Sequence, residues 1–132
     1  MRVHKAGSRP TRRANPDYFT GTVWQDVVAE PEGSARAAAL FVHFEPGART
    51  NWHTHPHGQT IHVLSGICRA QLRGEPVVEL HPGDTVFFPP ETEHWHGAAP
   101  HSAMTHLAIQ EAEGGVTAHW LEPVSETDYT AI

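Results

Sequence analysis

The most informative part of the sequence is the stretch GARTNWHTHPHGQTIHVLSG, which covers residues 47–66. Within it His53 and His55 stand two residues apart, and on an extended strand this spacing places both imidazoles on the same face. Gln59 keeps the same parity, although a proline and a glycine turn the chain between them. Two imidazoles and an amide oxygen gathered in this way are candidate metal ligands.

A second pair of histidines lies further along the chain. His94 and His96 are again two residues apart, and they follow a run of strand-forming residues at 85–88. Two histidines from one strand, one from a distant strand and an amide oxygen make a four-ligand site with open positions for a substrate. Three nitrogens and one oxygen suit a borderline divalent ion, so Mn²⁺, Fe²⁺, Co²⁺, Ni²⁺ and Zn²⁺ are all candidates.

The composition narrows the class of protein. The chain has 132 residues, which predicts one domain, and twelve of them are histidines. A net charge of −6 argues against nucleic acid as the main partner. The single cysteine cannot form an internal disulfide, and no stretch approaches the roughly 20 apolar residues of a membrane helix. We therefore expect a cytoplasmic protein that binds neither nucleic acid nor membrane.

Short runs rich in Val, Ile, Thr, Phe and Trp alternate with Pro and Gly along most of the chain. This pattern predicts an all-β sandwich or barrel. Trp52 and Trp95 are out of phase with the neighbouring histidines, so they are expected to pack on the other side of the barrel. Ser125, with Asp128 three residues later, predicts a short helix in the tail. The expected strands cover residues 22–28, 36–45, 60–64, 67–73, 76–80, 85–88, 103–110 and 116–121.

The beginning of the chain has a different character. Residues 1–16 are polar and contain five of the nine basic residues. We expect an N-terminal arm over residues 1–16, either loose or packed on a partner subunit. The β-barrel domain is then expected to cover residues 17–132.

The two histidine windows resemble the motifs of the cupins. Gly47-x5-His53-x-His55-x3-Gln59-x6-Gly66 resembles their first motif, with Gln in place of the usual Glu. Gly83-x5-Pro89-x4-His94 resembles the second, although Glu91 replaces the usual glycine and Ala98 the usual asparagine. The resemblance implies a single-domain cupin β-barrel of the jelly-roll type, with the metal inside the barrel mouth. It also implies a dimer or a higher homo-oligomer.

Five segments carry a narrower resemblance: DYFTGTV (17–23), FEPGART (44–50), HTHP (53–56), HWHGAAP (94–100) and MTHLAIQE (104–111). They are similar to the bacterial manganese-dependent hydroxynitrile lyases of the cupin superfamily, which also use Gln as a ligand. The resemblance implies Mn²⁺ held by His53, His55, Gln59 and His94. It further implies a small carbonyl or cyanohydrin substrate, and a dimer or tetramer.

The ligand types favour a non-redox reaction. Three neutral imidazoles and a neutral amide leave the full charge on the ion, which makes it a stronger Lewis acid. Cyanohydrin cleavage also needs a base for the hydroxyl proton, and His96, on the same strand face as His94, is the first candidate. His106 and Gln110 share a parity and can hold the substrate, and one of them could be the alternative base. Thr50 could donate a hydrogen bond to the substrate oxygen.

Leu40, Val42 and Phe44 share one strand face and would form an apolar wall of the pocket. Such a wall suits an aromatic or branched aldehyde.

The sequence also allows other functions. The same site could add nitroalkanes to aldehydes, or belong to a cupin isomerase, decarboxylase or dioxygenase. A non-catalytic, metal-dependent binding protein is a further alternative. Gln59 could also support the ligands from behind, and His106 and Gln110 could merely hydrogen-bond to each other.

Overall fold

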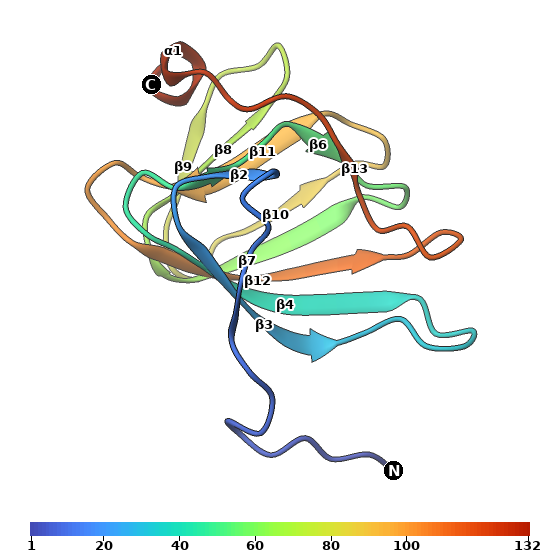
Figure 1. Cartoon of the computed structure of the whole chain (residues 1–132). Coiled ribbons are helices and arrows are strands. Elements are labelled where there is room, and N and C mark those ends of the chain that lie inside the picture. Colours follow the sequence, from blue (N-terminus) through green and yellow to red (C-terminus); the bar gives the residue numbers. More distant parts are fainter.

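Two curled antiparallel sheets face each other in the computed structural model, which describes residues 1–132 (Figure 1). One sheet, called the larger because its strands contain more residues, has six strands in the order β1-β3-β4-β12-β7-β10. The other, called the smaller, has seven mostly short strands in the order β13-β6-β11-β5-β2, with β8 pairing with β11 and with β9. The strands are β1 (Arg12–Arg13), β2 (Phe19–Thr20), β3 (Val23–Ala29), β4 (Ala37–Phe44), β5 (Arg49–Thr50), β6 (His53–Thr54), β7 (Gln59–Gly66), β8 (Cys68–Leu72), β9 (Val78–Leu80), β10 (Thr85–Phe88), β11 (His94–Ala98), β12 (Met104–Glu111) and β13 (His119–Trp120).

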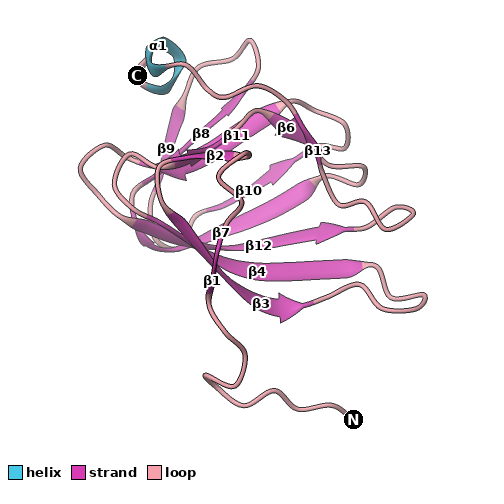
Figure 2. Ribbon diagram, in the orientation of Figure 1, coloured by secondary structure: helices cyan, strands magenta, loops and turns pink.

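Helix is confined to one turn near the C-terminus, α1 (Glu126–Tyr129), drawn in cyan in Figure 2. Ser125 is its N-cap, and its side chain accepts a hydrogen bond from the backbone N–H of Asp128. The predicted tail helix and the all-β class are both confirmed. No helix in the structure has the length and apolar character needed to cross a membrane.

Pairing between distant segments sets the inner face of the larger sheet. β12 lies between β4 and β7, so His106 is paired with Val42 on one side and Val63 on the other. Gln110 lies opposite Gln59 in the same way. Because side chains alternate along each strand, these residues face the space between the sheets. The buried apolar core there consists of Ala14, Val23, Val42, Phe44, Ala48, Ile61, Val63, Cys68, Ala70, Phe88, Ala98, Met104 and Ala108.

The outer side of the smaller sheet carries a second apolar cluster. Trp95 and Trp52 are buried there with Val77, Val124 and Tyr129, so the segment that includes α1 covers this side of the sheet. The indole Nε1 of Trp95 donates to Gln71 Oε1 at 2.8 Å. The prediction that these two tryptophans pack away from the histidines is confirmed.

Most expected strands are present within a few residues of their predicted ends, but the last one is much shorter. The run predicted over residues 116–121 contributes only β13, at His119–Trp120. The two-residue strands β1, β2, β5 and β6 were not predicted as separate elements, since two residues carry no readable alternation. The expected ranges also omit β11, although its histidines were expected on one strand face. The expected arm is attached at its end, because β1 pairs with β3 and Ala14 is buried in the core.

The structure explains why the last position of the first motif, Gly66, is a glycine. Its φ of 76° is in the left-handed region, and a Cβ there would lie 1.7 Å from the carbonyl oxygen of Ala103. Only glycine lets β7 end this close to the beginning of β12.

Candidate metal centre and pocket

Strand pairing in the smaller sheet brings the two histidine windows together. His53 on β6 lies opposite His94 on β11, and Trp120 on β13 lies on the other side of His53. The rings of His53 and His94 are 4.3 Å apart between centroids, and the ring of His55 is 4.9 Å from that of His53. Three buried histidines, His53, His94 and His96, have potential ligand atoms within 4.8 Å of one another and could hold a metal ion.

Hydrogen bonds to backbone carbonyls fix the orientation of three of these rings. The Nδ1 atom of His53 lies 2.9 Å from the carbonyl oxygen of Asn51, and that of His94 lies 2.9 Å from the carbonyl oxygen of Thr92. The Nδ1 atom of His55 lies 2.5 Å from the carbonyl oxygen of Thr117. A carbonyl only accepts, so each Nδ1 carries the proton and each Nε2 carries a lone pair. This is the orientation that metal-binding histidines adopt in proteins.

The free lone pairs suit a divalent cation. The Nε2 atom of His55 is buried and has no hydrogen-bond partner. The Nε2 atom of His94 lies 3.1 Å from Gln59 Oε1, and with the proton on its Nδ1 neither of these two atoms can donate. Buried acceptors that converge without a proton between them are stabilised by a positive charge. The chemistry of the donor set therefore fits a metal ion.

His96 belongs to a different hydrogen-bond pattern. Its Nδ1 atom lies 2.9 Å from Nε2 of His106, whereas its Nε2 atom lies 3.1 Å from Gln59 Oε1. The two imidazoles therefore form a buried pair beside the other histidines. The Nδ1 atom of His106 is buried without a partner. This pairing leaves His96 without the carbonyl contact that orients the other three rings.

Two amide side chains join the site from the larger sheet. Gln59 Nε2 donates to Gln110 Oε1 at 2.9 Å, and Gln110 Nε2 donates to the carbonyl oxygen of Ala38 at 3.4 Å. Gln110 is thus paired with Gln59 and His106 with His96, so the two do not satisfy each other. Because its amide nitrogen is held in this way, Gln59 directs its Oε1 atom toward the histidines.

Thr50 lies beside His96. Its hydroxyl oxygen accepts a hydrogen bond from the backbone N–H of His96 at 3.2 Å, so its own O–H remains free to donate. Thr50 also lines the cavity described next.

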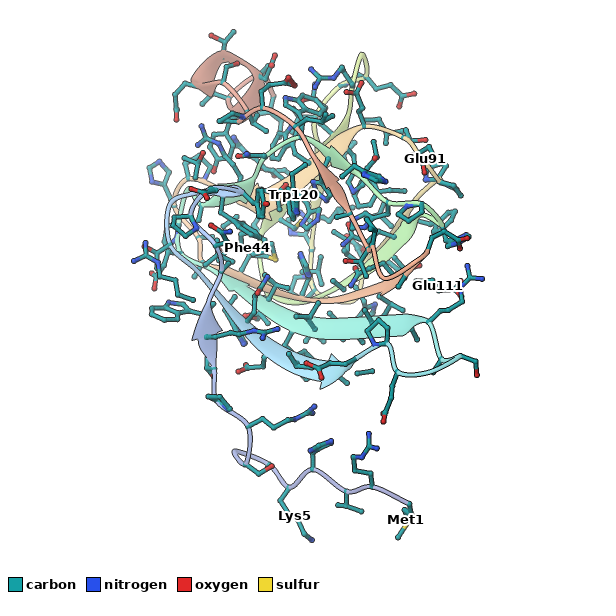
Figure 3. The ribbon with its side chains drawn as sticks, turned by 45° about the vertical axis from the view of Figure 1, so that its right-hand side comes forward. Met1, Lys5, Phe44, Glu91, Glu111 and Trp120 are labelled. Atoms are coloured by element: carbon teal, nitrogen blue, oxygen red, sulfur yellow. The ribbon has the colours of Figure 1, made fainter.

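A cavity of about 250 Å³ opens onto these polar residues. Leu40, Val42 and Ala108 form one apolar wall, and Phe19 and Trp120 form another. Phe44, expected in that wall, does not line the cavity; its side chain, labelled in Figure 3, has its ring 5.3 Å from that of His106. The remaining lining residues are Gln25, Thr50, His53, His55, Gln59, His96, His106, Gln110, Thr117 and Ala118.

Sequence reasoning missed the contribution of the C-terminal segment to this cavity. The Trp120 ring lies 4.7 Å from that of His53 and stacks on Tyr18, also at 4.7 Å. Thr117 contributes its backbone carbonyl to His55. No periodic pattern marks either residue, because they follow a glycine pair and β13 is only two residues long. Their role depends on pairing with β6, more than 60 residues away in sequence.

Burial keeps the whole histidine cluster neutral near pH 7. It is the main cause that lowers the pKa of His94 and of His106 to about 3. It also lowers the pKa of His55, and it holds the pKa values of His53 and His96 well below 6.5, with a further contribution from neighbouring histidines. Neutral imidazoles offer their lone pairs to a metal or to a proton.

Comparison with known proteins agrees with this geometry. A family model described as Cupin domain matches residues 40–109. A curated (R)-mandelonitrile lyase from the bacterium Granulicella tundricola is 49% identical over 129 residues, which cover 98% of both chains.

Solved structures give the same result for the fold. A cupin-like protein from Thermotoga maritima is 39% identical, with a TM-score of 0.84 over 98% of this chain and 95% of its own. A polyketide cyclase from Streptomyces resistomycificus is 20% identical, with a TM-score of 0.73 over 98% of this chain and 89% of its own, which shows the fold alone. The two curled sheets, the histidines between them and these likenesses lead to one conclusion: the chain belongs to the cupin family.

Proposed function

We propose that this protein is a metal-dependent lyase that cleaves or forms cyanohydrins. The observation that carries the proposal is the neutral His96–His106 pair, which borders the cavity next to three histidines whose Nδ1 atoms contact backbone carbonyls, so that their lone pairs are on Nε2. The 49% identity to a mandelonitrile lyase supports the same reaction, since mandelonitrile is the cyanohydrin of benzaldehyde. Cleavage of the cyanohydrin would release a small carbonyl compound and hydrogen cyanide, and the reverse reaction would join them.

His53, His55 and His94, with the Oε1 atom of Gln59, are the proposed metal ligands. The three histidines share the carbonyl contact at Nδ1, which separates them from His96. Mn²⁺ is the proposed ion, with Fe²⁺, Zn²⁺, Co²⁺ and Ni²⁺ as alternatives that the same donors accept. When bound, the ion supplies positive charge that stabilises the negative charge developing on the substrate.

His96 is the proposed base. In the tautomer whose Nδ1–H donates to His106, Nε2 of His96 carries the lone pair and takes the hydroxyl proton of the cyanohydrin. The electron pair of that O–H bond forms the carbonyl, and the bond to the nitrile carbon breaks with its electrons on cyanide. The proton held on His96 then passes to cyanide, so aldehyde and hydrogen cyanide leave and the base is restored. In this proposal Nε2 of His106, which lies 2.9 Å from Nδ1 of His96, accepts that hydrogen bond and so favours the required tautomer.

The remaining cavity residues bind and orient the substrate. Thr50 has a free O–H to donate to the substrate oxygen, and Gln110 keeps Gln59 in place through their hydrogen bond. The apolar walls suit the ring of an aromatic aldehyde, and a cavity of about 250 Å³ has room for one. Nitroalkane addition to the same aldehydes would use the same base, because a nitronate is another stabilised carbanion.

The test is the release of benzaldehyde from racemic mandelonitrile. Protein stripped with a chelator and reloaded with Mn²⁺ should consume one enantiomer faster, and the stripped protein should not exceed buffer. His96→Ala should lower kcat by about 10²- to 10⁴-fold, the usual contribution of a general base. His101→Ala, at an exposed histidine in the loop after β11, is the matched control and should be unchanged. Reloaded protein that binds Mn²⁺ but releases no aldehyde above buffer would refute the proposal.

A further inference from the structure

One polar residue of the cavity lies apart from the histidine cluster. Gln25 lines the cavity from β3 and is only partly exposed. Thr50 and Thr117 each contact one of the clustered histidines, whereas the side-chain amide of Gln25 forms no hydrogen bond within the chain. An amide that lines a cavity without a protein partner is available to a ligand, because a polar group that loses water needs another hydrogen-bond partner.

Strand pairing places Gln25 at the opposite end of the cavity from the reacting groups. Gln25 is opposite Val42 on β4, and Val42 is opposite His106 on β12, so the three residues form one row across the larger sheet. Since neighbouring strands lie about 4.8 Å apart, the backbone of Gln25 is about 10 Å from that of His106. Leu40 and Ala108 extend the apolar wall beside Val42. The cavity therefore has two polar ends that are separated by apolar side chains.

A positive charge lies next to Gln25 at the edge of the sheet. Arg12 on β1 is opposite Gln25, and Ala14, two residues further along, is buried in the core (β1 and β3 are labelled in Figure 2). Pairing and alternation both place the side chain of Arg12 on the inner side of the sheet. The guanidinium is exposed and forms no ion pair within the chain. Because arginine only donates hydrogen bonds, this end of the cavity favours an oxygen that accepts them.

The distance between the two ends matches an aromatic ring that carries an oxygen on its far side. With the reacting carbon near His106 and the ring on Val42, the para position of the ring is directed toward Gln25. We propose that Gln25, with Arg12 beside it, binds a hydroxyl group on the ring of the substrate. This inference rests on the proposed lyase function and names its substrate class, which is the para-hydroxybenzaldehydes and their cyanohydrins. The Gln25 amide can donate to the phenol oxygen and accept its O–H.

The first test is binding, measured by titration calorimetry on the Mn²⁺-loaded protein. The probes are para-hydroxybenzyl alcohol and para-methylbenzyl alcohol, which are similar in size and do not react. Gln25→Leu should lower the preference for the hydroxyl probe, taken as the ratio of the two dissociation constants, by about 3- to 10-fold, the net effect of one hydrogen bond. Trp24→Leu, at the outward neighbour on β3, is the matched control and should leave the ratio unchanged. The ratio does not depend on the folded fraction, because both probes are measured on the same preparation.

Arg12→Gln separates the contribution of the charge from that of the amide. It should lower the same ratio by less than Gln25→Leu does, because the guanidinium is exposed to water. An unchanged ratio after Arg12→Gln would remove Arg12 from the binding group. An unchanged ratio after Gln25→Leu would overturn the proposal.

The second test is cyanohydrin formation from para-hydroxybenzaldehyde and para-methylbenzaldehyde, with the rate in buffer subtracted. The ratio of the two kcat/KM values should fall in Gln25→Leu by the same factor, since the intrinsic reactivity of each aldehyde is the same with both proteins. Turnover of both aldehydes with an unchanged ratio would overturn the role of Gln25 and leave the lyase function intact. No turnover of either aldehyde, together with a changed binding ratio, would refute the lyase function and retain the hydroxyl site.

Discussion

The two sides of strand β11 have opposite properties, although their residues alternate along one short segment. Trp95 faces outward into an apolar cluster, where its only polar atom is satisfied by Gln71. His94 and His96 face inward, where several buried nitrogen and oxygen acceptors converge. Apolar packing of this kind stabilises the fold, whereas uncompensated polar burial does not. Alternation along this one strand is therefore enough to separate the residues that stabilise the fold from those that line the candidate site.

Tyr129 shows how the outer side supports the inner one. Its hydroxyl donates to the carbonyl oxygen of Ala98, at the end of β11, at 2.5 Å. Its ring lies 4.2 Å from the guanidinium carbon of Arg49, which is buried next to Thr50 on β5. The C-terminal segment therefore fixes both strands that carry Thr50 and His96. Such a rigid support holds the inward side chains in place despite their unfavourable burial.

The largest effect is expected from the inner side, with His94→Ala. It removes one proposed nitrogen ligand, so Mn²⁺ affinity should fall at least about 100-fold, beyond the loss typical of residues that only support a ligand. Cyanohydrin cleavage should fall to the level of buffer at a Mn²⁺ concentration that saturates the parent protein. Bound metal after desalting, measured by mass spectrometry, separates this loss from unfolding. Unchanged Mn²⁺ affinity would remove His94 from the ligand set.

A substitution on the outer side of β11 should lower the stability of the fold and leave the activity nearly unchanged. Trp95→Ala removes a fully buried indole, so the free energy of unfolding should drop by about 3–5 kcal/mol. The kcat of the remaining folded protein should stay within about threefold, because the side chain faces away from the cavity. Urea unfolding and kcat corrected for the folded fraction measure the two quantities. A large loss of kcat with little loss of stability would contradict the division between the two sides.

The sequence was sufficient to predict the fold and which strand residues point into or out of the barrel, but not all the residues that line the cavity. Motif spacing and parity placed His53, His55 and His94 together, and set Trp95 apart, because alternation along a strand is a local property. Trp120, Thr117 and the burial of Arg49 depend on pairing and packing between distant segments. Their local sequence therefore carries no signal of the site. The separate roles of His94 and His96 likewise depend on which partner each Nδ1 atom meets.

A fall in pH below 6.5 should destabilise the folded protein through its buried histidines. In the unfolded chain a histidine takes up a proton near pH 6.5, whereas folded His94 and His106 do so only near pH 3. Between these values the unfolded state binds more protons, so stability falls as the pH falls, and above pH 6.5 these groups have no effect. Each adds up to about 1.4 kcal/mol per pH unit.

Metal-free protein unfolded with urea between pH 7.5 and 5 measures this slope. His106→Gln removes one of the buried histidines that cause the slope, so we expect a slope shallower by up to about 1.4 kcal/mol per pH unit. The same change at exposed His101 should leave the slope unaltered. Equal slopes in the parent and in His106→Gln would show that His106 is not held neutral by burial.

The smallest effect concerns the loop that leads into β11. Glu91 has a φ of 57°, which a non-glycine residue adopts only with strain, and it stands where the cupin motif usually has glycine. Its backbone N–H donates to the carbonyl oxygen of His55 at 2.9 Å, a bond that glycine retains. Relief of strain should exceed the extra entropy of glycine in the unfolded chain, so Glu91→Gly should stabilise by about 0.5–1 kcal/mol.

A rise of about 2–4 °C in Tm, with unchanged kcat, is the expected result. Glu75→Gly, at an exposed glutamate whose φ is not positive, is the matched control and should lower Tm, because it adds unfolded-state entropy without relieving strain. A lower Tm for Glu91→Gly would mean that the side chain contributes more than its backbone costs. In that case the loop is stabilised by Glu91 itself, and its departure from the motif is an adaptation of this chain.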